Sequence, residues 1–133
     1  STARLLRKTK MERQSLFFLY DYRDAPALHR MNKKIQFMMR AYNREDVDGI
    51  FNQGIEVPVI HADAKFYSDS LMGVIRGKGI RLWMNALGKY DTMEKTETNS
   101  GFDALLQMRH TNIIQTDLYK ELMDYLKVRG LHR

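Results

Sequence analysis

Residues 73–79, Gly-Val-Ile-Arg-Gly-Lys-Gly, are the segment whose composition comes nearest to a phosphate-binding loop. Such a loop surrounds phosphates with backbone N–H groups, places a lysine on the terminal phosphate and follows it with a Ser or Thr for magnesium. Here the spacing is one residue short, Gly79 stands where the hydroxyl is needed, and no strand is expected before the loop. We interpret the segment as a glycine-rich break between two helices.

Histidine and cysteine indicate no further site. His29, His61, His110 and His132 lie far apart and show no metal-ligand spacing. The sequence contains no Cys, which excludes disulfides, thiolate nucleophiles and cysteine zinc centres. No nucleophile–base pair is recognisable, and only a site assembled from distant residues stays open. The sequence therefore predicts a protein that is not an enzyme, with no catalytic residue, metal or cofactor.

Positive charge is concentrated in the first third of the chain. The 133 residues carry 22 Lys and Arg against 16 Asp and Glu, a net charge of +6. Residues 1–44 hold eleven of the basic and three of the acidic residues, a net +8, which leaves −2 for residues 45–133. This asymmetry predicts a local contact with an anionic partner. The residues expected to make it are Arg4, Arg7, Lys8, Lys10, Arg13, Arg30, Lys33 and Lys34.

Apolar spacing predicts helices along nearly the whole chain. Asp24 and Pro26 favour a helix start, and apolar residues then recur at intervals of three and four as far as Tyr42. The other predicted helices cover residues 5–22, 45–52, 63–77 and 80–90, and two more begin at Ser100 and Thr116. Residues 55–60 have the composition of a strand, but Pro58 and the lack of a partner strand favour an extended linker.

The predicted helices form three pairs that begin near residues 25, 63 and 100, at intervals of 38 and 37 residues. Even spacing is typical of helical repeats, because one hairpin cannot bury its apolar face without a neighbour. An irregular helical bundle is the alternative. The predicted fold is all-α: about three helix hairpins over residues 25–133, behind a basic N-terminal helix or arm over residues 1–24.

Four large apolar residues fall outside the predicted inward faces or crowd the end of the first helix. They are Phe17, Phe18, Phe37 and Met39. Together they would give a small monomer more apolar surface than it readily hides, which predicts an interface with a protein partner.

Residues 66–93 resemble a pentatricopeptide repeat. They place the aromatic pair Phe66-Tyr67 and small polar residues before an apolar pair, then a glycine, then an amphipathic segment ending in Met93. Residues 117–123 are similar to the first helix of such a unit. The family acts mostly in mitochondria and chloroplasts, and its long members bind single-stranded RNA. The resemblance implies Ser68, Asp69 and Ser70 as RNA-contacting candidates.

The resemblance implies a mitochondrial matrix protein with a larger protein partner. About three repeats would contact about three bases, too few for useful specificity, so we expect a non-catalytic structural subunit of ATP synthase or of the mitochondrial ribosome. The alternatives are an organellar RNA-binding protein in RNA processing or translation, and a viral helical interaction protein. The opening stretch from Ser1 to Lys8 fits a processed targeting region or ordinary trimming. No apolar run approaches the ~20 residues of a membrane span, so no membrane insertion is expected.

Overall fold

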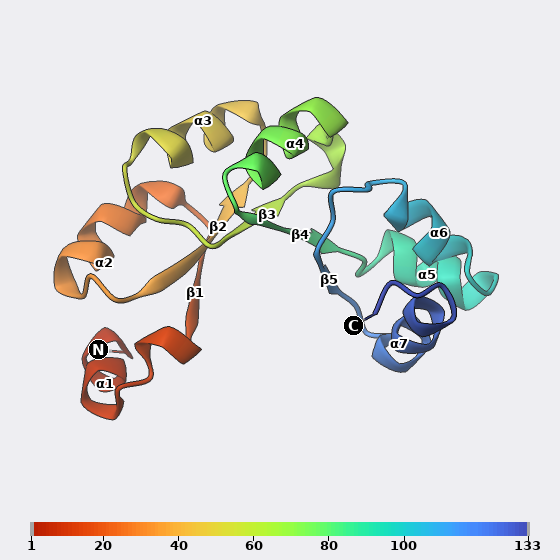
Figure 1. The fold of residues 1–133 in the computed structure, drawn as a ribbon, viewed down its shortest axis with the longest axis horizontal. Helices are drawn as coiled ribbons and strands as arrows, with labels where there is room; N and C mark the ends of the chain where they lie inside the picture. The colour runs from red at the N-terminus through yellow and green to blue at the C-terminus, as the bar shows by residue number, and fades with distance from the viewer. Residues whose placement is uncertain (1, 133) are drawn as a thin grey trace.

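A five-stranded parallel sheet forms the centre of the computed structural model, which describes residues 2–132 (Figure 1). Its strands are β1 (Leu16–Leu19), β2 (Gln36–Ala41), β3 (Val59–Ala62), β4 (Arg81–Asn85) and β5 (Ile113–Gln115). Each strand pairs in parallel with the next one along the chain, so the spatial order equals the sequence order. This is the arrangement of strands in the wall of a (β/α) barrel, whereas a doubly wound sheet reverses its order at a switch point.

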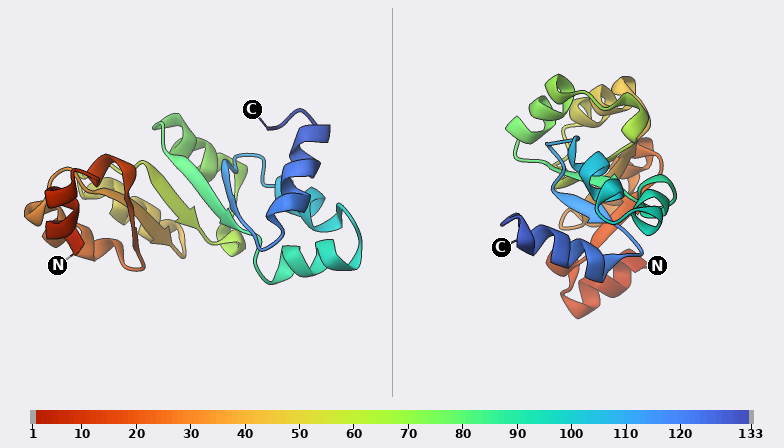
Figure 2. Two further views of the ribbon diagram at one scale, coloured as in Figure 1. Left: turned by 90° about the horizontal axis from the view of Figure 1, so that it is seen from below. Right: turned by 90° about the vertical axis from the view of Figure 1, so that its right-hand side faces the viewer.

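Helices connect the strands and extend the fold at both ends. They are α1 (Thr2–Thr9), α2 (Ala25–Met31), α3 (Arg44–Asn52), α4 (Asp69–Gly77), α5 (Lys89–Thr96), α6 (Ser100–Leu106) and α7 (Tyr119–Val128), with short 3-10 helices η1 (Glu12–Gln14), η2 (Tyr22–Asp24) and η3 (Ala64–Phe66). In Figure 1, α2, α3 and α4 lie along one side of the sheet. Figure 2 shows the N-terminal and C-terminal elements at opposite ends of an elongated molecule. Over residues 2–132, no helix has the length and apolar character needed to cross a membrane.

The main core lies between the sheet and helices α3 and α4. In β2, Phe37, Met39 and Ala41 are fully buried against these helices. Successive side chains of a strand point to opposite faces, so Met38 and Arg40 face away from the helices. The core-facing strand residues are Phe37, Met39, Ala41, Ile60, Ala62, Leu82 and Met84. The sheet therefore has one covered face and one face that carries a different set of side chains.

The prediction of an all-α array of helix hairpins is wrong. Strands of a parallel sheet are short, nearly continuous apolar runs, and helical spacing can be found within them. The stripe expected from Asp24 to Tyr42 crosses two elements, because α2 ends at Met31 and β2 begins at Gln36. The helix expected over 80–90 is likewise β4 followed by the start of α5.

The expected extended linker over 55–60 is wrong in its second part, because β3 begins at Val59. Pro58 precedes the strand, where its missing N–H removes no ladder bond. The helix expected over 45–52 is confirmed by α3, whose N-cap Asn43 accepts the backbone N–H of Asp46 at 2.9 Å. The helix expected from Ser100 is confirmed by α6. Ser1, the expected processing site, lies outside the described residues.

Candidate functional site

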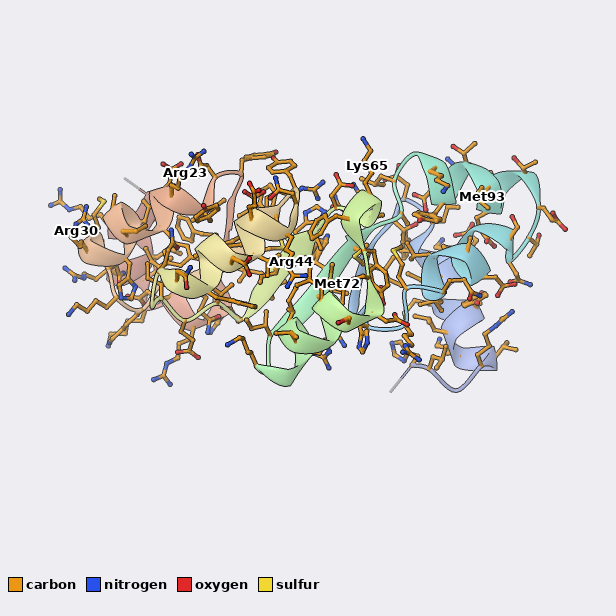
Figure 3. All side chains as sticks on the ribbon, turned by 90° about the horizontal axis from the view of Figure 1, so that it is seen from above. Arg23, Arg30, Arg44, Lys65, Met72 and Met93 are labelled. Carbon is orange, nitrogen blue, oxygen red and sulfur yellow. The ribbon has the colours of Figure 1, made fainter. Side chains whose placement is uncertain are left out.

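A hollow of about 490 Å³ opens at the carboxyl ends of β3 and β4. Its polar side chains belong to Arg40, Asp63, Lys65, Asn85, Lys89 and Tyr90. The carboxyl ends of parallel strands lie at one edge of a sheet, so residues that follow different strands meet there. We call these six residues the carboxyl-edge site. Figure 3 shows Lys65 extending from the loop after β3.

An ion pair joins the ends of β2 and β3 at this site. Arg40 Nη2 lies 3.1 Å from Asp63 Oδ2, and the two side chains are 16% and 25% exposed. Asp63 Oδ1 accepts the backbone N–H of Lys65 at 3.0 Å, which fixes the loop. The Arg40 guanidinium also lies 5.1 Å from the ring centroid of Tyr42. Its position is therefore held from two sides, while most of its five N–H groups are free of partners within residues 2–132.

His61 lies beside Arg40, in register on the neighbouring strand. It is 6% exposed, and burial, followed by the positive charge of Arg40, lowers the pKa of its imidazole to about 4 against a smaller opposing effect of Asp63. The ring is therefore neutral at neutral pH. Its buried Nε2 has no hydrogen-bond partner among the described residues. A neutral imidazole nitrogen can donate or accept one hydrogen bond, depending on the tautomer.

Aromatic side chains surround His61 on the face away from α3 and α4. Trp83 is its partner in β4, with ring centroids 6.3 Å apart, and Phe18 of β1 lies 5.7 Å away. The indole Nε1 of Trp83 is also buried without a partner in the part of the chain that the structure describes. Unpaired buried nitrogens are uncommon in folded proteins. Two of them lie on the adjacent strands β3 and β4, on the same face of the sheet as Arg40.

The cationic residues predicted from the sequence lie mostly at the opposite edge of the sheet. Arg7, Lys10 and Arg13 precede β1, whereas Arg30 and residues 33–34 precede β2, and all of them line a second hollow of about 640 Å³. Figure 3 shows Arg30 at the end of the molecule that the N-terminal elements form. Arg4 and Lys8 are exposed on α1 but do not line this hollow.

The predicted interface residues lie on opposite faces of the sheet. Phe37 and Met39 are fully buried beneath the helices, so they cannot form an exposed contact surface. Phe17 is half-buried against the same core. Phe18 faces the other side and belongs to the aromatic row beside His61.

The residues predicted to contact RNA have local structural roles. Ser68 Oγ accepts the backbone N–H of Leu71 at 3.3 Å and so caps α4. Asp69 accepts the hydroxyl of Tyr67 at 2.9 Å and pairs with Arg109 at 2.8 Å, and Ser70 is exposed on α4. The helical repeat that implied a base-contacting role for them is not the fold of residues 2–132.

Two buried carboxylates hold the C-terminal elements together. Glu94, 7% exposed, accepts the backbone N–H groups of Asn99, Gly101 and Phe102 at 2.6, 3.1 and 3.2 Å. Asp91 accepts the hydroxyl of Thr116 at 2.6 Å and the backbone N–H of Asp117 at 2.9 Å. Both carboxylates therefore accept hydrogen bonds that stabilise the fold. Nowhere in residues 2–132 do three potential metal-ligating side chains gather into one group.

Sequence reasoning missed the carboxyl-edge site. Lys65, Asn85 and Lys89 have no predicted role, and Asp63 and Tyr90 enter the prediction only as ends of the helices over 63–77 and 80–90. The available signal was a polar residue directly after each buried apolar run, as with Asp63 after β3 and Asn85 at the end of β4. That signal has meaning only when the runs are recognised as neighbouring parallel strands.

The fold and this edge define the class of the protein as a parallel α/β protein with strands in consecutive order. Among solved structures, the chain is similar to a glycerophosphoryl diester phosphodiesterase from Parabacteroides distasonis, with a TM-score of 0.75 and 16% sequence identity. The match covers 96% of this chain and 46% of that one, so the chain spans less than half the length of the phosphodiesterase. No family model matches the sequence, and no curated protein matches it significantly.

The structural likeness corrects the functional predictions together with the fold. The resemblance to pentatricopeptide repeats is wrong, because the matched fold is a parallel α/β fold. The structural subunit of a mitochondrial assembly, the organellar RNA-binding protein and the viral helical protein all depended on an all-helical chain, and they are wrong as well. The expectation that the protein is not an enzyme is also corrected, since the matched fold is that of an enzyme.

Proposed function

We propose that the chain provides a phosphodiester-binding site at the carboxyl edge of a phosphodiesterase-like α/β fold. One observation supports this most directly: Arg40, Lys65 and Lys89 converge on one hollow at that edge. Enzymes built from consecutive parallel β/α units place their active sites at this edge. The similar solved protein acts on a phosphodiester according to its name, and the positive charge of the hollow suits the negative charge of such a substrate.

The three cations suit a phosphodiester in different ways. The planar guanidinium of Arg40 can donate two parallel hydrogen bonds to the non-bridging oxygens of one phosphate. Asp63 orients this guanidinium through their ion pair. Lys65 and Lys89 are exposed and flexible, so they add attraction for the anion with less geometric demand.

His61 and Trp83 lie on the same face of the sheet as Arg40 but outside the lining of the hollow. Their unpaired nitrogens lie one strand and two strands away from Arg40 on the same face of the sheet. A pKa of about 4 makes the imidazole a weak base at neutral pH, because an efficient general base has a pKa near the working pH. We therefore assign His61 no role as a general base.

Titration with a glycerophosphoryl diester, followed by backbone amide NMR shifts, tests the proposal. The largest shifts are expected at Ala64, Lys65 and Lys89. The double variant Lys65→Gln/Lys89→Gln should weaken binding about tenfold or more, because two nearby positive charges are lost. The matched control is Lys120→Gln/Lys127→Gln, which removes the same charge from α7 and should change affinity less than twofold.

Two results would contradict the proposal. One is an absence of amide shifts around residues 62–65 and 86–90 at millimolar diester. The other is an equal loss of affinity in the double variant and its control, which would show that only net charge matters.

A further inference from the structure

The amino edge of the sheet gathers a second set of cations. Arg7, Lys10, Arg13, Arg30, Lys33 and Lys34 line the hollow of about 640 Å³. They come from two segments, residues 7–13 before β1 and residues 30–34 before β2. Because β1 and β2 run parallel, the segments that precede them meet at the same edge. We call these six residues the amino-edge cluster.

None of the six cations forms an ion pair with an acid of residues 2–132. Among the described residues the lining holds one carboxylate, that of Glu12, which is 8% exposed and accepts a hydrogen bond from the side-chain amide of Asn32 at 3.5 Å. Asn32 is 4% exposed, and its Oδ1 accepts the backbone N–H of Lys34 at 3.0 Å. The floor of the hollow is thus fixed by hydrogen bonds while the cations around it repel one another, a cost that a bound anion would remove.

Lys10 adds an independent observation, because it holds a backbone conformation that favours glycine. Its φ is 57°, and α1 ends there with the Met11 N–H donating to Leu6 O at 3.1 Å and the Lys10 N–H to Arg7 O at 3.4 Å. Helix α7 ends with the same pair of bonds and has Gly130, φ 66°, at that position. A lysine in this conformation strains the backbone. Because Lys10 lines the hollow, a role of its side chain in binding would explain why a lysine and not a glycine stands at this position.

We infer that the amino-edge cluster binds a compact anion carrying several phosphate groups, an oligophosphate, at a site separate from the carboxyl-edge site. Three arginines can each donate paired hydrogen bonds to phosphate oxygens, and three lysines add mobile point charges. Among the described residues, Met31 is the one apolar residue in the lining, and six of the other eight are cationic. The six cations of the lining match a small ligand with a high density of negative charge.

Calorimetric titration of the chain with inorganic tripolyphosphate and with orthophosphate at constant ionic strength tests the inference. Tripolyphosphate should bind at least tenfold more tightly, since it can contact several cations at once. The variant Arg30→Gln/Lys33→Gln/Lys34→Gln should weaken its binding at least tenfold. The control Lys95→Gln/Lys120→Gln/Lys127→Gln makes the same change in net charge elsewhere and should change binding less than twofold.

The variant Lys10→Gly separates a binding role from a structural one. It should raise the denaturant concentration of half-unfolding, because glycine relieves the strain, and at the same time weaken tripolyphosphate binding severalfold. A rise in stability with unchanged binding would overturn the role of Lys10. Equal losses in the two triple variants, or tighter binding of an oligonucleotide or of anionic lipid vesicles at equal phosphate concentration, would overturn the inference as a whole.

Amide NMR shifts distinguish this site from the carboxyl-edge site. Tripolyphosphate should shift the amides of residues 31–34, and shifts confined to residues 63–65 would count against the amino-edge cluster. A failure of the diester to bind at the carboxyl edge would leave this inference intact, since no residue is shared between the two sites.

Discussion

Arg40 and His61 face each other in register on neighbouring strands, and the positive charge of Arg40 helps to keep His61 neutral. Burial of the imidazole acts in the same direction, whereas the carboxylate of Asp63 acts against both. Burial is thus the largest cause of the lowered pKa of His61, and the two charges of the ion pair at the ends of β2 and β3 adjust it in opposite directions.

The free energy of unfolding should fall on acidification because of His61. Its pKa is about 4 in the folded protein and near 6.5 when unfolded, so between these values the unfolded chain binds more protons. The contribution of His61 to the free energy of unfolding is therefore complete above pH 6.5 and is lost progressively as the pH falls to 4. The loss amounts to about 2 kcal/mol after allowance for solvent screening. Urea unfolding of the protein and of His61→Gln between pH 7 and pH 4.5 measures this difference.

The variant His132→Gln is the control, because His132 is exposed near the C-terminus. It should keep the pH dependence of the unmodified chain. A His61→Gln variant with an unchanged slope would show that other groups cause the acid sensitivity.

Substitutions of Arg40 and of Asp63, the two members of the ion pair, should shift the pKa of His61 in opposite directions. Arg40→Gln removes a charge that lowers the pKa, so the pKa should rise, whereas Asp63→Asn removes a charge that raises it, so the pKa should fall further. Imidazole carbon-bound proton shifts followed by NMR across pH 3–8 give both values. Shifts of the same sign would mean that changed burial, not charge, dominates.

The close crossing of α5 and α6 depends on Gly101. A Cβ at this position would collide with the carbonyl oxygen of Tyr90 and lie 2.8 Å from the backbone nitrogen of Glu94. Gly101→Ala should therefore lower the free energy of unfolding by about 2–3 kcal/mol. Gly77→Ala is the matched control, because a Cβ there meets no atom within 4 Å, and it should be neutral or slightly stabilising.

Glu94 should matter for stability through the helix start it caps. Its carboxylate accepts three backbone N–H groups at the beginning of α6, so Glu94→Ala leaves buried donors unpaired and should cost about 2–3 kcal/mol. Chemical unfolding measures the loss. The control is Glu97→Ala. Glu94 lies in α5, and Glu97 is an exposed carboxylate directly after the end of that helix, so its removal should cost less than about 0.5 kcal/mol.

The sequence predicted local features of this fold better than the fold itself. Apolar spacing and start signals act within a few positions, so α3 and α6 could be placed from the sequence, although the residue before α6 is Asn99 and Ser100 lies inside the helix. The strands could not, because β2 and β4 are apolar runs whose identity depends on pairing with segments about twenty residues away. The prediction places helices at β2 and β4, which are the two partners of β3, so residues 55–60 lack a partner strand in it.

The two candidate sites differ in the same respect. The cations of the amino-edge cluster are visible as a run of positive charge, and six of the eight predicted residues meet in the structure. Arg40, Asp63 and Lys89 come together only through the parallel alignment of strands. A site of that kind becomes predictable once the strands are known, since it lies where they end.

The consecutive order of the strands also determines how the sheet loosens. Each strand pairs only with its neighbours in sequence, so we expect the outer strands β1 and β5 to open while β2, β3 and β4 stay paired. Backbone amides of the three central strands should then exchange with solvent most slowly. Arg40 belongs to β2 and Asp63 directly follows β3, so we expect the ion pair between them to persist when either end of the molecule opens.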